Sequence, residues 1–129
     1  MAGPIVYISH NRVKPGQLEP LVQFYLEQVK IVHADKPGTL VYLGYVNEDG
    51  TEVTFVHVFP DAEAFDRHMQ AVPERVKVAF QLMEPRRLEL YGMPSQATLE
   101  QIKKLVGAGV ALSHDPQYVG GFVRSAANS

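Results

Sequence analysis

The segment LVYLGYVNEDGTEVTFVHVF, residues 40–59, carries the clearest structural signal in the sequence. Two runs of β-branched and aromatic residues, Leu40–Val46 and Val53–Phe59, flank the turn-forming tetrapeptide Asn47–Gly50, which predicts an antiparallel hairpin. Neither run contains a charged residue, so both faces of the hairpin favour burial.

A strand and a helix are predicted before the hairpin. The residues from Ile5 to Ile8 are β-branched or aromatic and predict a strand that ends near Asn11. A helix is predicted between the turn signal Pro15-Gly16 and the stop signal Lys36–Gly38. Its apolar residues recur at helical spacing: Leu18, Leu21, Val22, Tyr25, Val29 and Val32.

A second helix and a fourth strand are predicted after the hairpin. Asp61 is placed to accept the first free backbone N–H groups of this helix, and the helix is broken or kinked near Pro73. Its apolar stripe consists of Phe65, Met69, Val72, Val76, Ala79, Phe80 and Met83. Arg87–Tyr91 alternates as a half-exposed strand does. The order β-α-β-β-α-β predicts an α+β, ferredoxin-like fold, a four-stranded antiparallel sheet with both helices on one face.

Residues 94–129 extend this core. Thr98–Gln101 matches a capping box and Gly107 is a stop signal, which together predict a helix. Its apolar stripe consists of Leu99, Ile102, Leu105 and Val106. Val110–Leu112 and Tyr118–Val123 are predicted to form short edge strands or an arm. We therefore expect a single domain, 1–129, with a core at about 4–93 and a C-terminal helix and arm at 94–129.

The composition excludes several classes of protein. Apolar residues make up 46% of the 129 residues, as in an ordinary globular core. The net charge of -2, without a Lys/Arg block, argues against nucleic-acid and membrane partners. There is no cysteine, which excludes thiolate metal sites and a cysteine nucleophile. No segment has the character of a signal peptide or a membrane span, which predicts a cytoplasmic protein.

The hairpin also predicts a homodimer. Two helices can cover only one face of the predicted sheet, and an uncovered apolar face is larger than a monomer usually exposes. A second copy packed through the same sheet face, about a two-fold axis, would cover it. The alternative is that the C-terminal tail folds back over this face.

The segment FVHVFPDAEAFDRH, residues 55–68, leads from the third strand into the pattern Asp-x-x-Ala-Phe-x-x-His. With the β-α-β-β-α-β order, it resembles the antibiotic biosynthesis monooxygenase family of dimeric α+β barrel proteins, over about residues 5–93. Oxygenase and haem-degrading members of that family often have a Trp at the end of the third strand, where this chain has Phe59. Asn11-Arg12 and His68 are similar to functional residues of the haem-degrading branch.

His68 and Asn11 are the candidate catalytic residues. His68 lies on the helix face that meets the sheet, where a neutral imidazole could act as a general base or ligate haem iron. A structural histidine bonded to backbone is the alternative. Asn11 could orient an oxyanion through its amide N–H, or serve as a turn residue. The candidate substrate-binding residues are Phe59, His57, Tyr25 and Phe65, with a further aromatic lining from Tyr7, Phe24, Tyr42 and Tyr45.

Three functions remain open at this point. The resemblance implies a monooxygenase that needs no cofactor and oxidises a hydroxylated aromatic or quinol with molecular oxygen. A non-catalytic dimer that binds a small aromatic molecule, and a haem-binding or haem-degrading protein, are the alternatives. No metal site is predicted, because His10 is expected on a different face from His57 and His68. Gly-x-Ser-x-Gly and His-Glu-x-x-His motifs are absent, which argues against the common hydrolase types.

Overall fold

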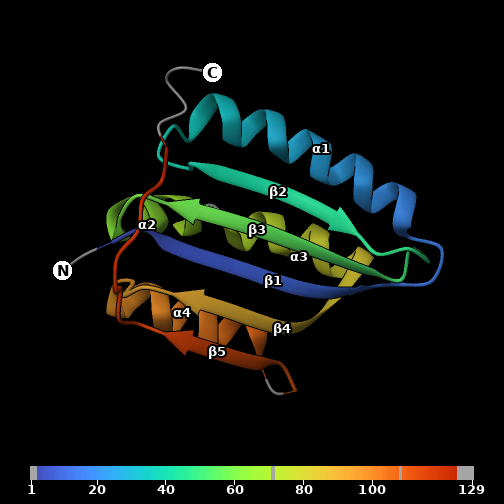
Figure 1. Ribbon diagram of the computed structural model, residues 1–129. Coiled ribbons are helices and arrows are strands. Elements are labelled where there is room, and N and C mark those ends of the chain that lie inside the picture. Colours follow the sequence, from blue (N-terminus) through green and yellow to red (C-terminus); the bar gives the residue numbers. More distant parts are fainter. Residues whose placement is uncertain (1–2, 71, 108, 125–129) are drawn as a thin grey trace.

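Figure 1 shows the computed structural model of the chain, which describes residues 3–70, 72–107 and 109–124. Its helices pack on one face of a single sheet. The elements in chain order are β1 (Ile5–Val13), α1 (Leu18–Asp35), β2 (Val41–Val46), β3 (Glu52–Phe59), α2 (Ala62–Gln70), α3 (Val72–Leu82), β4 (Met83–Tyr91), α4 (Gln96–Val106) and β5 (Ala111–Asp115).

The sheet has the strand order β2-β3-β1-β4-β5. The predicted hairpin is confirmed, with Val46 opposite Val53 and Val41 opposite Val58. β1 pairs antiparallel with both β3 and β4, which gives the expected ferredoxin-like arrangement. The expected sheet of four antiparallel strands is corrected in one respect, because β5 adds a fifth strand parallel to β4.

The second predicted helix is interrupted, as the sequence indicates. It forms two helices, α2 and α3, and residue 71 between them lies outside the described residues. Asp61 caps α2, since its Oδ1 accepts a hydrogen bond of 2.8 Å from the backbone N–H of Ala64. α3 then continues directly into β4.

The predicted capping box at Thr98–Gln101 is wrong, because Ser95 caps α4. The Ser95 hydroxyl accepts from the backbone N–H of Thr98 at 3.2 Å. Thr98 is buried inside the helix and donates its hydroxyl to Asp66 of α2 at 2.5 Å. Gly107 ends the helix as predicted. Of the two predicted tail strands, the first forms as β5, whereas Tyr118–Val123 has no strand structure.

The core lies between the sheet and the helices, and α4 belongs to it. Ile102 of α4 is fully buried in one cluster with Phe65 of α2 and Leu90 of β4. A second cluster joins Leu21 of α1 to Phe55 of β3 and Ala79 of α3. Among the helices of the described residues, none is long and apolar enough to cross a membrane.

On the other face of the sheet, none of the helices in the described part of the chain covers the strands (Figure 1). Leu43 and Tyr45 of β2 point to this face and are 45% and 58% exposed. Residues 116–124 run along one end of the sheet toward α1, so this part of the tail does not cover the outer side chains of β2. The apolar outer patch consists of Val6, Ile8, Val41, Leu43, Val56 and Val58, which share this face by strand alternation.

Two isoleucines on helices test whether the C-terminal extension is part of the core. Ile102→Ala is expected to lower the free energy of unfolding by about 2–5 kcal/mol, because a fully buried side chain leaves a cavity. Ile31→Ala on α1, where the side chain is 46% exposed, should change it by less than about 1 kcal/mol. Urea denaturation of both variants measures the difference. Equal, small effects would show that α4 does not stabilise the domain.

Candidate functional site

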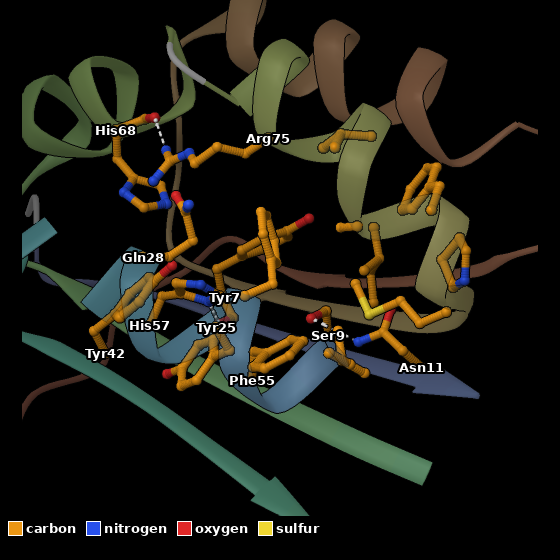
Figure 2. A pocket seen from close by; sticks show the side chains of 18 of the residues that line it. Tyr7, Ser9, Asn11, Tyr25, Gln28, Tyr42, Phe55, His57, His68 and Arg75 are labelled. Atoms are coloured by element: carbon orange, nitrogen blue, oxygen red, sulfur yellow. Dashed lines mark hydrogen bonds between the residues drawn. The ribbon is translucent and has the colours of Figure 1, made fainter. Parts of the chain in front are cut away.

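A cavity of about 140 Å³ lies between the inner face of the sheet and helices α1, α2 and α3 (Figure 2). An engineered protein cavity of about 150 Å³ binds benzene, so this space suits a ligand with about one aromatic ring. β1, β2, β3 and β4 form its floor and the three helices form its walls. Most of the lining is apolar; the polar and aromatic lining residues are Tyr7, Ser9, Asn11, Phe24, Tyr25, Gln28, Tyr42, Phe55, His57, His68, Arg75 and Phe80.

Two histidines define the polar end of the cavity. The rings of His57 on β3 and His68 on α2 have centroids 5.5 Å apart, and Tyr42 of β2 lies against both. Arg75 of α3 reaches the same end, where its guanidinium donates to the backbone carbonyl of His68 at 3.1 Å. Figure 2 shows these side chains together, with Gln28 of α1 beside them.

His57 is held as a neutral imidazole of one tautomer. Its Nδ1 lies 3.0 Å from the carbonyl of Tyr7, which can only accept, so Nδ1 carries the proton. Burial lowers the pKa of His57 to about 4; the bond to Tyr7 opposes this, and the Arg75 charge adds to it. Nε2 is therefore a lone-pair acceptor at neutral pH.

His68 is also neutral and is incompletely hydrogen-bonded. Burial lowers its pKa to about 3, helped by His57, Arg75 and Lys36. Its Nδ1 is buried and has no hydrogen-bond partner within the described part of the chain. An unpartnered buried polar atom costs about 1–3 kcal/mol, so its presence needs a reason, and a catalytic role is one such reason.

Tyr25 and Gln28 add two further unpartnered atoms to the same cavity. The Tyr25 hydroxyl and the Gln28 Oε1 are buried without a partner among the described residues. The Tyr25 ring stacks on Phe55 and Tyr42, at centroid distances of 4.7 Å and 5.3 Å. Gly44 makes room for it, because a Cβ there would lie 2.8 Å from the ring. Burial raises the pKa of Tyr25 above its ordinary value, so its hydroxyl is protonated and can donate.

The two candidate catalytic residues lie at different ends of the cavity. Asn11 is on β1 four residues beyond Tyr7, about 13 Å along the strand. It is buried, and its amide nitrogen donates to the Ser9 hydroxyl at 3.2 Å and the Val53 carbonyl at 3.5 Å. Both amide hydrogens are thus engaged within the protein, so an oxyanion would have to compete with Ser9 and Val53 for them, and the catalytic role of Asn11 stays a prediction. The side-chain carbonyl oxygen of Asn11 accepts no hydrogen bond from the described residues.

Of the four candidate substrate-binding residues, His57 and Tyr25 line the cavity, whereas Phe59 and Phe65 lie behind it. The two phenylalanines are fully buried, with ring centroids 5.0 Å apart. Phe59 also packs against the His68 ring at 5.1 Å. Phe59 thus contacts both imidazoles from the core side, and Phe65 packs behind Phe59. Tyr7, Phe24 and Tyr42 line the cavity as expected, but Tyr45 points to the outer face because it is three residues from Tyr42 on the strand.

Arg75 and Gln28 were not predicted from the sequence. Gln28 follows Tyr25 by three residues and Leu21 by seven, so helical periodicity places it on the inner face of α1. Arg75 follows His68 by seven residues, which is two turns of an uninterrupted helix. The break between α2 and α3 removes that signal.

The geometry does not favour a metal site. His10 lies on the outer face, where its Nε2 is 2.5 Å from Glu89, so it cannot share an ion with His57 and His68. In residues 3–70, 72–107 and 109–124, no group of three His, Asp or Glu side chains could hold a metal ion.

Comparison with known proteins agrees with this fold. The family model described as antibiotic biosynthesis monooxygenase matches residues 4–77. No curated protein matches by sequence. MupZ from Pseudomonas fluorescens is similar in structure, with a TM-score of 0.69, 18% identity, and coverage of 95% of each chain.

Two further solved structures share the core. SnoaB, a cofactor-independent oxygenase from Streptomyces nogalater, has a TM-score of 0.60 and 14% identity, covering 74% of this chain and 97% of that chain. A conserved protein from Methanosarcina mazei has a TM-score of 0.60 and 16% identity, covering 70% of this chain and 92% of that one. At these identities the likeness shows the fold alone.

The lowered histidine pKa values predict acid sensitivity. In the unfolded chain a histidine takes up a proton near pH 6.5, whereas in the folded protein His57 and His68 stay neutral down to about pH 4. The unfolded state therefore binds more protons in this range, and the free energy of unfolding falls as the pH falls from about 6.5 toward 4. His68→Gln should reduce the slope of unfolding free energy against pH in this window by up to about 1.4 kcal/mol per pH unit. Urea denaturation at fixed protein concentration measures it, with the exposed His33→Gln as control. An unchanged slope in His68→Gln would contradict the assignment.

Proposed function

Because this chain belongs to the antibiotic biosynthesis monooxygenase family, we propose that it oxidises a hydroxylated aromatic or quinol with molecular oxygen and without a cofactor. The observation that carries this proposal is His68, a neutral, buried histidine with an unpartnered Nδ1 at a cavity of one-ring size. Such a group can accept a proton from a substrate hydroxyl held in the cavity.

In the proposed reaction the substrate is its own reductant. His68 takes the phenolic proton, and the phenolate passes one electron to oxygen. The two radicals combine to form a ring C–O bond, and the proton returns to give a hydroperoxide. Loss of water breaks the O–O bond and leaves a quinone carbonyl. The substrate loses four electrons and oxygen gains four, with one oxygen atom in the quinone and one in water.

The low pKa of His68 means that proton transfer from the substrate needs a second stabilising interaction. A free imidazole of pKa about 3 is a weak base. The phenolate that forms beside it supplies a negative charge, which raises the pKa of the imidazolium and favours the transfer. Proton transfer is thus effective only with substrate in place, and the apolar lining strengthens that ion pair.

The cavity favours oxidation over the two alternative functions. A passive binding module needs no unpartnered polar groups, yet His68, Gln28 and Tyr25 each present one here. Haem has four pyrrole rings in one plane, which exceeds a space of about 140 Å³. Within the proposal, Phe59 and Phe65 keep the imidazoles in place, whereas Asn11 lies at the far end of the cavity, beyond the reach of a one-ring substrate held at His68.

Oxygen uptake by metal-free and haem-free protein tests the proposed base. Wild-type protein is expected to exceed the autoxidation rate on at least one member of a panel of quinols and polyhydroxylated aromatics. His68→Ala should lower the enzymatic rate by roughly 100-fold or more, as for loss of a general base. His33→Ala, on the exposed side of α1, is the matched control and should keep the wild-type rate.

Two outcomes would count against the proposal. Full activity in His68→Ala would remove His68 from the proton transfer. A wild-type rate that never exceeds autoxidation across the panel would favour the non-catalytic binding dimer.

We also propose that two copies of the chain pack through the outer faces of their sheets. The apolar outer patch lies on β1, β2 and β3, and contains half-exposed or exposed side chains such as Leu43 and Val56, which face each other across the hairpin. An apolar patch shared by three strands favours a covering partner, and a two-fold axis lets the patch cover itself.

Two leucines of similar exposure test this dimer. Leu43→Glu places a charge in the outer patch and should convert the protein to a monomer, because burying an unpaired carboxylate is costly. Leu26→Glu on α1, where the side chain is 49% exposed compared with 45% for Leu43, should leave the dimer intact. Sedimentation equilibrium measures both. A monomeric wild type, or a dimeric Leu43→Glu variant, would refute the interface.

A further inference from the structure

Arg75 lines the cavity and differs from Arg67 and Arg87 in its charged neighbours. Arg67 pairs with Glu63 at 2.8 Å, and Arg87 lies 3.7 Å from Glu89. Arg75 has no carboxylate within 4 Å among the described residues, and the hydrogen bond its side chain makes there goes to the backbone carbonyl of His68. A guanidinium has five N–H donors in a planar fork, so most of the donor capacity of this cavity-lining side chain is unused within the described part of the chain.

Among the described residues that line the cavity, Arg75 is the one with a formal charge, because Asp, Glu and Lys are absent from this lining and both histidines are neutral. A further charge that acts on His68 is that of Lys36, which is also positive. The Arg75 charge acts on Tyr42: burial raises the pKa of Tyr42, and the positive charge of Arg75 partly offsets this rise. A cation at an apolar wall with no counter-charge favours an anion in the cavity, because the low local dielectric strengthens the attraction.

We propose that the ligand of this cavity carries an anionic oxygen, which Arg75 binds at the end of the cavity where His68 lies. This deepens the proposed function, and rests on it in taking the same cavity as the substrate site. Tyr25 can donate a second hydrogen bond to the anion. Gln28 Oε1 accepts and needs a donor, so the ligand also presents a hydroxyl group. The ligand class is a one-ring hydroxylated compound with a carboxylate, or with a phenolate formed in the site.

Charge recognition is tested with benzoate and benzamide, which have nearly the same shape but differ in charge. Ligand-observed NMR titration of wild-type protein should show tighter binding of benzoate. Arg75→Met should weaken benzoate binding by roughly 10-fold or more, as for loss of a charged hydrogen bond, while benzamide binding stays within a factor of about two. Benzamide binding also reports that the variant cavity is intact. Arg75→Lys should keep part of the preference, and Arg67→Met on the outer side of α2 should keep all of it.

The two sources of the anion are separated with 4-nitrophenol, which ionises near neutral pH and is yellow only as the phenolate. If Arg75 holds a phenolate, the bound probe should ionise at lower pH than the free probe. In Arg75→Met it should ionise at higher pH, because an apolar cavity without a cation disfavours the charged form. A preference for benzoate without any change in nitrophenol ionisation identifies a carboxylate as the anion.

The inference is overturned if benzoate and benzamide bind equally and nitrophenol ionisation is unchanged, if the preference survives Arg75→Met, or if none of the three probes binds. These titrations involve no turnover, since benzoate has no phenolic proton to lose. An inactive protein that keeps the Arg75-dependent preference would contradict the oxygenase and leave the anion site standing. An active protein without that preference would support the oxygenase and contradict the anion site.

Discussion

The pairing of β3 between β1 and β2 is the constraint on which the cavity depends. In this register His57 lies opposite Tyr7 on one side and Tyr42 on the other, so one row across three strands carries a histidine between two tyrosines. The next row places Phe55 opposite Gly44, whose missing side chain leaves the space that the Tyr25 ring fills. A slip of one residue would turn both rows to the outer face and abolish the site.

Local signals predicted most of the fold, and non-local contacts decided the rest. The hairpin, α1 and the break between α2 and α3 follow from turn residues and periodicity close in sequence. β5 pairs in parallel with β4, and α4 connects the two strands. The sequence of a five-residue strand does not indicate which strand it will pair with. Ser95 and Thr98 both suit an N-cap by residue type, and Ser95 is the one that accepts from the backbone. Both hydroxyls also donate to Asp66 of α2, a contact between helices that the local sequence does not reveal.

The candidate site was also predictable where local spacing places a residue, and not where contacts between distant segments decide. His68, His57 and Tyr25 could be placed by strand alternation and helix spacing, and the structure brings them to one end of the cavity. The hydrogen bonds that use the Asn11 amide come from Ser9 and from Val53 on another strand, so the sequence alone does not reveal them. Arg75 depends on the angle between α2 and α3, which no local pattern encodes.

The two faces of the sheet are mechanically linked by the same alternation. Val56 on the outer face is bonded directly to His57 on the inner face, and Leu43 likewise to Tyr42. A partner packed against Val56 and Leu43 therefore restrains the strands that form the cavity floor without touching a ligand, because close-packed side chains transmit small displacements. His68 and Arg75 come from helices on the opposite side and are not restrained in this way. In the proposed dimer, packing of the two outer faces should accordingly fix the floor of the cavity, while His68 and Arg75, the proposed proton acceptor and the proposed anion ligand, remain free to move.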